Sequence, residues 1–400
     1  MWASVYAFGF LDSFYLDQFL WIVYLLHLGY GVALIGLGYA VLQAGRIAFD
    51  VPSSLLADRF GGRVVLAAGA VAKVVGAVLF LFAGRGYGYM LVGCLVTSLA
   101  LTLPSGVDLA YVRAVTGAGS SPEGAASRRF MGYVAMQYLA SLIAAALGGL
   151  IATRSFSQLY EADAAAGVLM LAVALALPRT APVGRAQRVR LRTAFKTLVG
   201  AARPGFWLLG LSTALLWACS SVATDYSQTL LFVLRLRPYA ISLAFAGAGV
   251  LAWLTTLAAG RATGRVQERL LRWGVLGYPA AAAVRAAAAV VRQGAAAVAV
   301  GGIGLGRATS GVSGLLDQRL LDAAPEGLQA TALSVIMTVQ LGLIMVLYPA
   351  LGLVAGGAGL GAVFLILCAG LLACSLVVMK AVRAQAEGDR VAACPASDGG

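Results

Sequence analysis

Long runs of apolar residues, separated by short polar or Gly/Pro-containing links, fill most of this 400-residue chain. About 20 apolar residues are enough to cross the hydrocarbon core of a bilayer, and each run approaches or exceeds that length. The runs lack the period-two alternation of barrel strands, so the pattern predicts helices. The twelve predicted spans are residues 5–27, 32–57, 64–83, 88–112, 129–152, 157–178, 205–234, 239–262, 270–291, 294–317, 328–354 and 359–382.

Composition supports a membrane protein. Hydrophobic residues make up 61% of the chain and charged residues 11%, and the mean hydropathy is +0.89. Soluble domains carry about 25% charged residues. The net charge of +13 would suggest a nucleic-acid partner in a soluble protein. Here the basic residues lie mostly in the short links, which indicates a lipid bilayer as the partner and no nucleic acid.

The distribution of Lys and Arg predicts the orientation. With the N-terminus inside, the cytoplasmic links, the central link and the tail hold twenty Lys and Arg residues, and the outer links hold five. Cytoplasmic loops carry the excess of positive charge. We therefore expect a multi-pass protein of the cell membrane with both termini in the cytoplasm.

The longest strongly basic stretch divides the chain into two halves. We expect an N-terminal six-helix bundle over residues 1–178, a basic cytoplasmic linker over 179–204 and a C-terminal six-helix bundle over 205–384. The polar residues 385–400 are predicted to be a disordered cytoplasmic tail. The linker is interpreted as a solvated segment near anionic headgroups rather than a partner site.

Cysteine and histidine usage argues against a metal site. The five cysteines form no C-x-x-C pair or ligand spacing, and the single histidine, His27, lies at the outer end of the first span. Free cysteines in apolar helices behave as small hydrophobes. We expect no metal, no cofactor and no disulfide framework.

A charged hairpin separates the second and third spans. It reads Val51-Pro-Ser-Ser-Leu-Leu-Ala-Asp-Arg-Phe-Gly-Gly-Arg-Val-Val-Leu66. The stretch resembles the signature loop of the major facilitator superfamily of secondary transporters, approximately G-x-L-A-D-R-x-G-R-K-x-x-L. Leu56, Ala57, Asp58, Arg59, Gly61, Arg63 and Leu66 match, whereas Ser54 replaces the usual glycine and Gly62 the usual basic residue. A plain interfacial turn is the alternative interpretation.

The resemblance implies an all-α fold with twelve transmembrane helices in two six-helix bundles related by pseudo-two-fold symmetry, acting as a monomer. It also implies that the loop latches the two halves on the cytoplasmic side in the outward-open state. Gly61 would permit the tight turn. An internal repeat agrees, because Asp17 to Tyr30 can be laid on Asp225 to Pro238 at a constant offset, and a degenerate loop, Gly260-Arg-Ala-Thr-Gly-Arg265, follows the corresponding span.

Weaker resemblances concern gating and direction. Asp50-Val-Pro-Ser is similar to an acid-x-Pro-Thr-Gly variant of efflux members, with Arg46 one helical turn before Asp50 and Pro52 able to bend the helix. We interpret this group as structural gating. Gln329-Ala-Thr-Ala-Leu-Ser334 resembles a stretch that opens span eleven in related carriers. Ala144 to Gly149 retains only the last two glycines of the antiporter motif G-P-x-x-G-G, so export is favoured without being established.

Ionisable residues at bilayer depth are functional candidates, because they are costly unless paired or hydrated. A shielded carboxylate in such a cavity could carry a proton or bind a cation in alternation. Permanent pairing of these acids with Arg46, Lys73, Arg285 or Arg307 is the structural alternative. The candidates for proton or substrate sites are Asp12, Tyr15 and Asp17 in span one, Asp225, Tyr226 and Gln228 in span seven, Arg46, Asp108, Arg113 and Arg307.

These observations favour proton-coupled export of a small amphipathic organic molecule. Proton-symport uptake of a metabolite on the same fold stays open as an alternative. A multi-pass membrane enzyme is a remote third, since the chain has neither an Asp-rich metal motif nor a well-placed histidine. We therefore expect no enzyme activity, and expect a small-molecule substrate and protons as partners.

Overall fold

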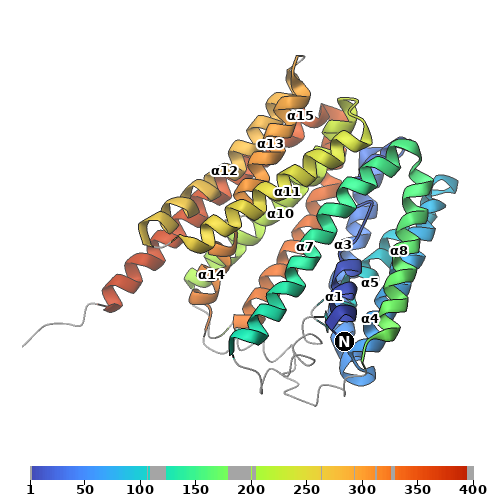
Figure 1. Cartoon of the computed structure of the whole chain (residues 1–400). Helices are drawn as coiled ribbons and strands as arrows, with labels where there is room; N and C mark the ends of the chain where they lie inside the picture. The colour runs from blue at the N-terminus through green and yellow to red at the C-terminus, as the bar shows by residue number, and fades with distance from the viewer. Residues whose placement is uncertain are drawn as a thin grey trace, which may run out of the picture. The chain divides into compact units, whose positions relative to one another are not determined.

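The structure is a computed structural model that describes residues 2–105, 107–108, 123–178, 200, 204–262, 264–291, 293–310, 313–325 and 329–393. Every described element is a helix (Figure 1). In chain order they are α1 (Trp2–Asp12), α2 (Trp21–His27), α3 (Val32–Phe60), α4 (Gly62–Leu81), the 3-10 turn η1 (Ala83–Arg85), α5 (Tyr87–Thr102), α7 (Glu123–Arg154), α8 (Phe156–Ala176), α10 (Pro204–Val233), α11 (Pro238–Arg261), α12 (Gly264–Val290), α13 (Ala295–Ser310), α14 (Ser313–Ala323) and α15 (Gln329–Ala393).

The observed helices follow the predicted spans closely in most of the chain. Nine segments of the described part are long and apolar enough to cross a membrane. The predicted spans 328–354 and 359–382 both lie in α15, where Gly359 has the non-helical angles φ 82° and ψ 170° and so separates two helices. An all-helical membrane fold is therefore confirmed, whereas the arrangement of twelve spans in two bundles stays a prediction.

Span one differs from its prediction. The sequence predicts an apolar run over 5–27, but α1 ends at Asp12 and α2 begins at Trp21, with turns between them. Asp12, Ser13, Asp17 and Gln18 place four polar side chains in this stretch, and such residues compete for backbone hydrogen bonds. In the predicted span four, α5 ends at Thr102, two residues before Pro104, and residues 107–108 are again helical.

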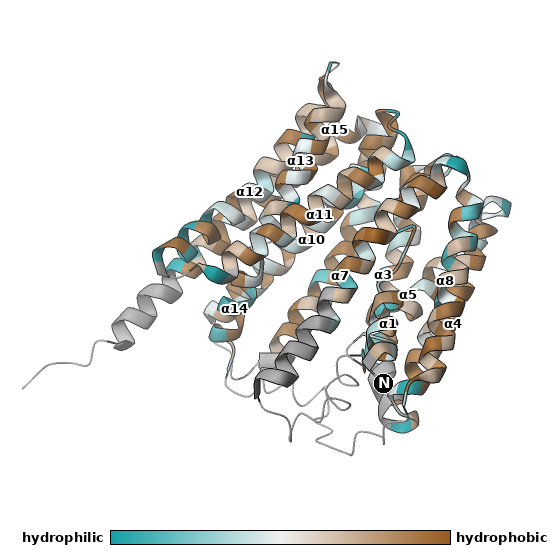
Figure 2. Cartoon of the chain, in the orientation of Figure 1, coloured by the Kyte–Doolittle hydropathy of each residue, from teal (hydrophilic) through white to brown (hydrophobic). Residues whose placement is uncertain are grey.

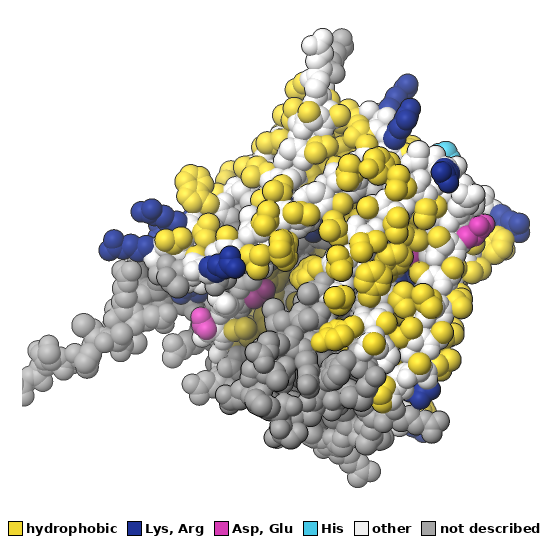
Figure 3. Space-filling view, in the orientation of Figure 1, with side chains coloured by type: hydrophobic (Ala, Val, Ile, Leu, Met, Phe, Trp, Pro, Cys, Tyr) yellow, Lys and Arg dark blue, Asp and Glu magenta, His cyan; other side chains and the backbone are white. Residues whose placement is uncertain are grey.

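The outer faces of the helices are apolar. On α4, Val64, Val71, Val75 and Val78 are each more than a third exposed, although all are hydrophobic. Figure 2 shows hydrophobic residues along the middle of α4, α7 and α11. Figure 3 shows hydrophobic side chains over much of the described surface in that view, with Lys and Arg mostly near its margins. Exposed apolar faces of this extent match a hydrocarbon solvent.

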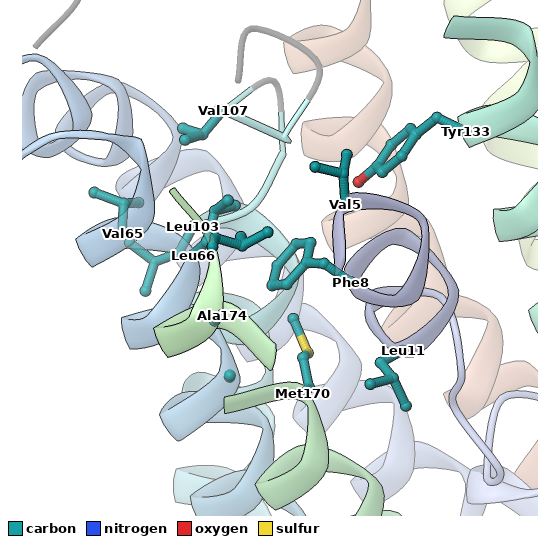
Figure 4. Close-up of a cluster of buried hydrophobic side chains, with 12 residues drawn as sticks. Val5, Phe8, Leu11, Val65, Leu66, Leu103, Val107, Tyr133, Met170 and Ala174 are labelled. Atoms are coloured by element: carbon teal, nitrogen blue, oxygen red, sulfur yellow. The ribbon is translucent and has the colours of Figure 1, made fainter. Parts of the chain in front are cut away.

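The described chain divides into two compact units. The first unit comprises Met1–Arg188, Leu231–Ala246 and Tyr348–Gly356, and the second comprises Val189–Leu230, Gly247–Leu347 and Gly357–Gly400. In the first unit, α4 packs against α5 and α8, and α1 packs against α7 and α8. A buried cluster joins these helices (Figure 4): Val5, Phe8, Leu11, Val65, Leu66, Ala70, Leu103, Val107, Tyr133, Met170, Ala174 and Leu177.

Candidate functional site

The candidate site is centred on the break in the first span, residues 13–20 between α1 and α2. Lys73 of α4 forms hydrogen bonds at the N-terminal side of this break. The Lys73 side chain is only 3% exposed. Its Nζ donates to the carbonyl of Leu11 at 2.9 Å and to that of Phe14 at 2.7 Å. The Leu11 carbonyl lies in the last turn of α1, where it also accepts from the Phe14 N–H at 3.3 Å, and the Phe14 carbonyl lies just beyond the helix. A cation at a helix C-terminus is favourable. Lys73 therefore stabilises the point at which α1 ends.

Asp163 of α8 forms a hydrogen bond with the backbone farther along the break. Its Oδ1 accepts a hydrogen bond from the backbone N–H of Leu16 at 3.2 Å, and the side chain is 3% exposed. Tyr15 lies beside Lys73, whose Nζ is 3.8 Å from the centre of its ring. Helices α4 and α8 thus supply one cation and one carboxylate that satisfy backbone groups of an unwound segment.

The break also gathers carboxylates. Asp12 interacts electrostatically with Asp108 and with Lys73. Asp17 interacts in the same way with Asp163 and with Lys73. Asp108 accepts hydrogen bonds from the Tyr133 hydroxyl at 3.0 Å and from Gln137 Nε2 at 3.3 Å. Three carboxyl groups, Asp12, Asp17 and Asp163, therefore interact with the buried ammonium group of Lys73, and a fourth, Asp108, interacts with Asp12.

A cavity of about 580 Å³ opens beside the break. Ser141 Oγ donates to Gln18 Oε1 at 2.7 Å at its edge. The wall combines acidic, amide and aromatic groups: Asp12, Ser13, Tyr15, Asp17, Gln18, Trp21, Tyr39, Leu42, Gln43, Arg46, Phe80, Thr97, Ala100, Leu101, Gln137, Tyr138 and Ser141. Ligand cavities of roughly 300–1,000 Å³ with a few convergent polar groups are typical of small-molecule sites.

Two adjacent glycines of α7, Gly148 and Gly149, allow this helix to lie close to the break and to α11. A Cβ at Gly148 would overlap the Leu16 carbonyl group, and a Cβ at Gly149 would lie 3.0 Å from the Cα of Tyr239. Beside them, Ser242 Oγ donates to the Ala145 carbonyl at 2.6 Å. These are the two glycines that the chain retains of the antiporter-like motif, and in this fold they permit close backbone packing.

The signature loop is placed at the junction of α3 and α4. Gly61 has φ 86°, in the region that only glycine adopts without strain, so the predicted tight turn is present. Arg63 donates to the Leu175 carbonyl near the end of α8. Arg59 is exposed over the Phe60 ring.

Other members of the gating group are only partly described. Asp50 is exposed, and Arg46 Nη1 donates to Gln43 Oε1 at 3.4 Å at the cavity. Helix α3 runs through Pro52 and Asp58, whose side chains lie outside the described residues. Arg113 lies outside the described residues altogether. The predicted gating roles therefore stay predictions.

The candidates of span seven lie in the second unit, on α10. Tyr226 and Gln228 are fully buried. Asp225 lies close enough to Arg307 of α13 for the two charges to interact. Asp17 likewise interacts with Lys73, so each of the two acids has one of the basic neighbours that the structural alternative names.

Asp163 is the functional candidate that the sequence analysis missed. It lies in the predicted span six at a depth where any ionisable residue qualifies as a candidate, so the rule that selected Asp17 could have found it. Lys73 was considered only as a partner for acids, and its contacts with the Leu11 and Phe14 carbonyls could not be anticipated without the break. Among the described residues, no group of three His, Cys, Asp or Glu side chains could hold a metal ion.

The fold is shared with solved transporters. The chain matches a crystal structure of the nucleoside transporter NupG with a TM-score of 0.79 and 14% identity, covering 95% of this chain and 99% of that one. It matches a D-xylose-proton symporter with a TM-score of 0.69 and 14% identity, covering 94% and 96%. A POT family transporter in complex with 5-aminolevulinic acid gives the same TM-score, identity and coverage.

No protein-family model matches the chain, and no curated protein matches it either. At 14% identity, these structures establish the fold alone. The chain has the fold of multi-pass transporters. The reported structures are all transporters.

Proposed function

We propose that this chain is a proton-coupled secondary transporter that exports a small amphipathic organic molecule by alternating access. The excess of carboxyl groups around the broken first span is the observation that carries this proposal. Asp12, Asp17 and Asp163 share the one buried ammonium group of Lys73, and Asp108 lies close enough to Asp12 to interact with it. An unpaired charge at bilayer depth costs several kcal/mol, so some of these groups need a proton or a cation to remain there.

Asp12 and Asp17 are the best candidates to exchange that proton. Both line the cavity, so solvent or substrate can reach them. Asp108 already accepts two hydrogen bonds, and Asp163 accepts the Leu16 N–H. A proton on Asp17 would weaken its attraction for a polar group of the substrate, which couples substrate release to proton entry.

The cavity wall supports an amphipathic substrate. Trp21, Tyr39 and Tyr138 offer aromatic surface, and Gln43 and Gln137 offer amide groups. Aromatic faces bury apolar area and the amides fix orientation through hydrogen bonds.

The architecture proposed with this function has two six-helix halves, residues 1–178 and 205–384, joined by the basic link 179–204. Both termini lie in the cytoplasm, as the distribution of Lys and Arg indicates. Such halves hold substrate near the middle of the membrane and rock around it. Uptake by proton symport is the second candidate, because a matched structure is described as a D-xylose-proton symporter.

Replacing the two cavity acids tests the proposal. A transported compound is first found by an accumulation screen of small amphipathic molecules in cells with and without the protein. Uptake driven by a pH gradient is then measured in proteoliposomes for the wild type, Asp17→Asn and Asp12→Asn. We expect each variant to lose proton-coupled transport by tenfold or more, about 1.4 kcal/mol.

Glu161→Gln provides the matched control, because Glu161 is an exposed acid on α8 two residues before Asp163. It should transport like the wild type. Unchanged coupled transport in both Asp variants would remove Asp12 and Asp17 from the mechanism. Comparing inverted with right-side-out vesicles decides between export and uptake.

A further inference from the structure

The second unit contains a buried arginine, Arg285 of α12, whose side chain does not extend to the nearby helix end. Arg285 lies five residues before the end of α12 at Val290, about 8 Å along the helix axis. An arginine so close to a helix end normally extends its guanidinium to the interface and keeps it wet. Arg285 instead is only 3% exposed.

The contacts of Arg285 show that its side chain extends away from the end of α12, along α13 toward the C-terminal part of that helix. Its Cγ lies against Gly302, where a Cβ would come within 2.9 Å, and its Nη2 lies against Gly306. Gly306 is eleven residues after Ala295, where α13 begins, about 16 Å along the axis. The two glycines, four residues apart on one face, leave the space that the side chain occupies.

The charge around the Arg285 guanidinium is positive. Its charged neighbour is Arg307, one residue after Gly306, and no described carboxylate forms an ion pair with it. Its Nε is buried with no hydrogen-bond partner among the described residues. Arg307 interacts with Asp225 and Tyr278, so Asp225 balances the charge of one of the two guanidinium groups.

We propose that Arg285 and Arg307 form a binding site for an oxyanion, a carboxylate or a phosphate group, between α12 and α13. The planar guanidinium presents a fork of N–H donors that matches such groups. An oxyanion there balances the second positive charge and satisfies the Arg285 Nε. This inference goes beyond the proton coupling proposed above and does not depend on it, because it concerns different residues and is tested by binding.

Hydrogen–deuterium exchange of the purified full chain tests the site without a transported substrate. The protein is placed in phosphatidylcholine nanodiscs with sodium phosphate or with sodium chloride at equal ionic strength. We expect phosphate to slow exchange in peptides of α12 and α13 by about threefold or more, since a ligand stabilises the form that binds it. A second set of discs with phosphatidylglycerol and no phosphate distinguishes a lipid headgroup from a free anion.

Two test variants, each with a matched control, separate binding at the site from a general salt effect. Arg285→Gln should abolish the protection, whereas Arg272→Gln, an exposed arginine on the same helix, should keep it. Gly306→Ala retains the charge but displaces the guanidinium and should weaken protection, in contrast to Gly301→Ala, where a Cβ meets nothing within 4 Å. The glycine pair keeps the test decisive if Arg285→Gln fails to fold.

The outcomes are distinct. Protection by phosphate that depends on Arg285 and Gly306 supports a site for free oxyanions, and the same dependence only with phosphatidylglycerol assigns the site to a lipid headgroup. Equal exchange with phosphate, with chloride and with phosphatidylglycerol overturns the proposal. So does protection that persists in both Arg285→Gln and Gly306→Ala. Neither result bears on transport by Asp12 and Asp17 variants, so the two proposals can fail separately.

Discussion

The ammonium group of Lys73 is buried among groups that each compensate for its desolvation. Two carbonyl oxygens accept its hydrogen bonds and the Tyr15 ring lies 3.8 Å away. The carboxylates of Asp12, Asp17 and Asp163 add attraction. Because these partners come from both sides of the broken span, Lys73 connects the cavity acids to the stability of the break.

Replacing Lys73 by Met should therefore lower stability as well as transport. The change removes the side-chain hydrogen bonds to the Leu11 and Phe14 carbonyls and the cation that the carboxylates share. Removing one partner from a buried charged group typically costs about 3–5 kcal/mol. We expect a clear decrease in the melting temperature of the detergent-purified protein, measured by differential scanning fluorimetry.

A double variant refines this prediction. In Lys73→Met with Asp163→Asn, both charges are absent, so the loss should be smaller than the sum of the two single losses. Lys380→Met is the control, since Lys380 is exposed on α15, and it should melt like the wild type. Strict additivity of the two single changes would show that Lys73 and Asp163 act independently.

At this scale the sequence predicted part of the site. Asp12 and Asp17 were selected because they interrupt an apolar run, and both line the cavity. The partners of the break are distant in the chain, with 147 residues between Asp163 and Leu16 and 62 between Lys73 and Leu11. A single sequence contains no local signal for such pairings, which arise only when α4 and α8 pack beside α1.

At the scale of elements, the broken first span depends on the helices that surround it. Gly148 of α7 faces the Leu16 carbonyl group, whose carbon would lie 2.9 Å from an added Cβ. The neighbour is backbone, so it cannot rotate away. The absence of a side chain at Gly148 therefore permits the unwound segment to lie directly against α7.

Gly148→Ala should destabilise the break. Overpacking in a close-packed interior costs about 1–3 kcal/mol, and here the strain falls on the segment that holds Asp17. We expect a lower melting temperature and a loss of coupled transport. The control is Gly247→Ala on α11, where a Cβ meets nothing within 4 Å. Because alanine favours helices, that variant should be at least as stable as the wild type. Wild-type behaviour of Gly148→Ala would mean that the break can shift away from α7.

The element boundaries indicate what hydropathy could predict. Spans bounded by Gly, Pro or charges agree with their helices, as in α8, which covers Phe156–Ala176 against the predicted 157–178. The interruption of span one was not predicted, because hydropathy averaged over a window is dominated by the aromatic and aliphatic residues around Asp12 and Asp17. The unwound backbone is stabilised by Lys73 and Asp163, and these lie on other helices.

At the scale of the whole molecule, the first unit includes two segments from the second half of the sequence. Within it, α3 lies close to the segment Tyr348–Gly356 of α15. A Cβ at Gly352 would be 3.0 Å from the Cα of Ala33, and a Cβ at Gly36 would be 2.9 Å from the Cα of Pro349. Small residues at both crossings allow close approach, as in many membrane helix pairs. In alternating access, such a contact has to open and close in each cycle.

A disulfide across this contact should therefore arrest transport. In a background without the native cysteines, Ala33→Cys with Gly352→Cys should cross-link on mild oxidation, because the two backbones approach so closely that a Cβ at position 352 would lie 3.0 Å from the Cα of Ala33. A protease site placed in the link 179–204 lets a gel report the cross-link as two halves that stay together. We expect transport in proteoliposomes to fall in proportion to cross-linking and to return on reduction.

The control pair, Leu79→Cys with Gly93→Cys, joins α4 to α5, where a Cβ at Gly93 would lie 3.6 Å from the Leu79 Cβ. Its cross-link lies within one predicted half and should leave transport unchanged. Full transport with the Ala33–Gly352 pair completely cross-linked would contradict a cycle that separates α3 from α15.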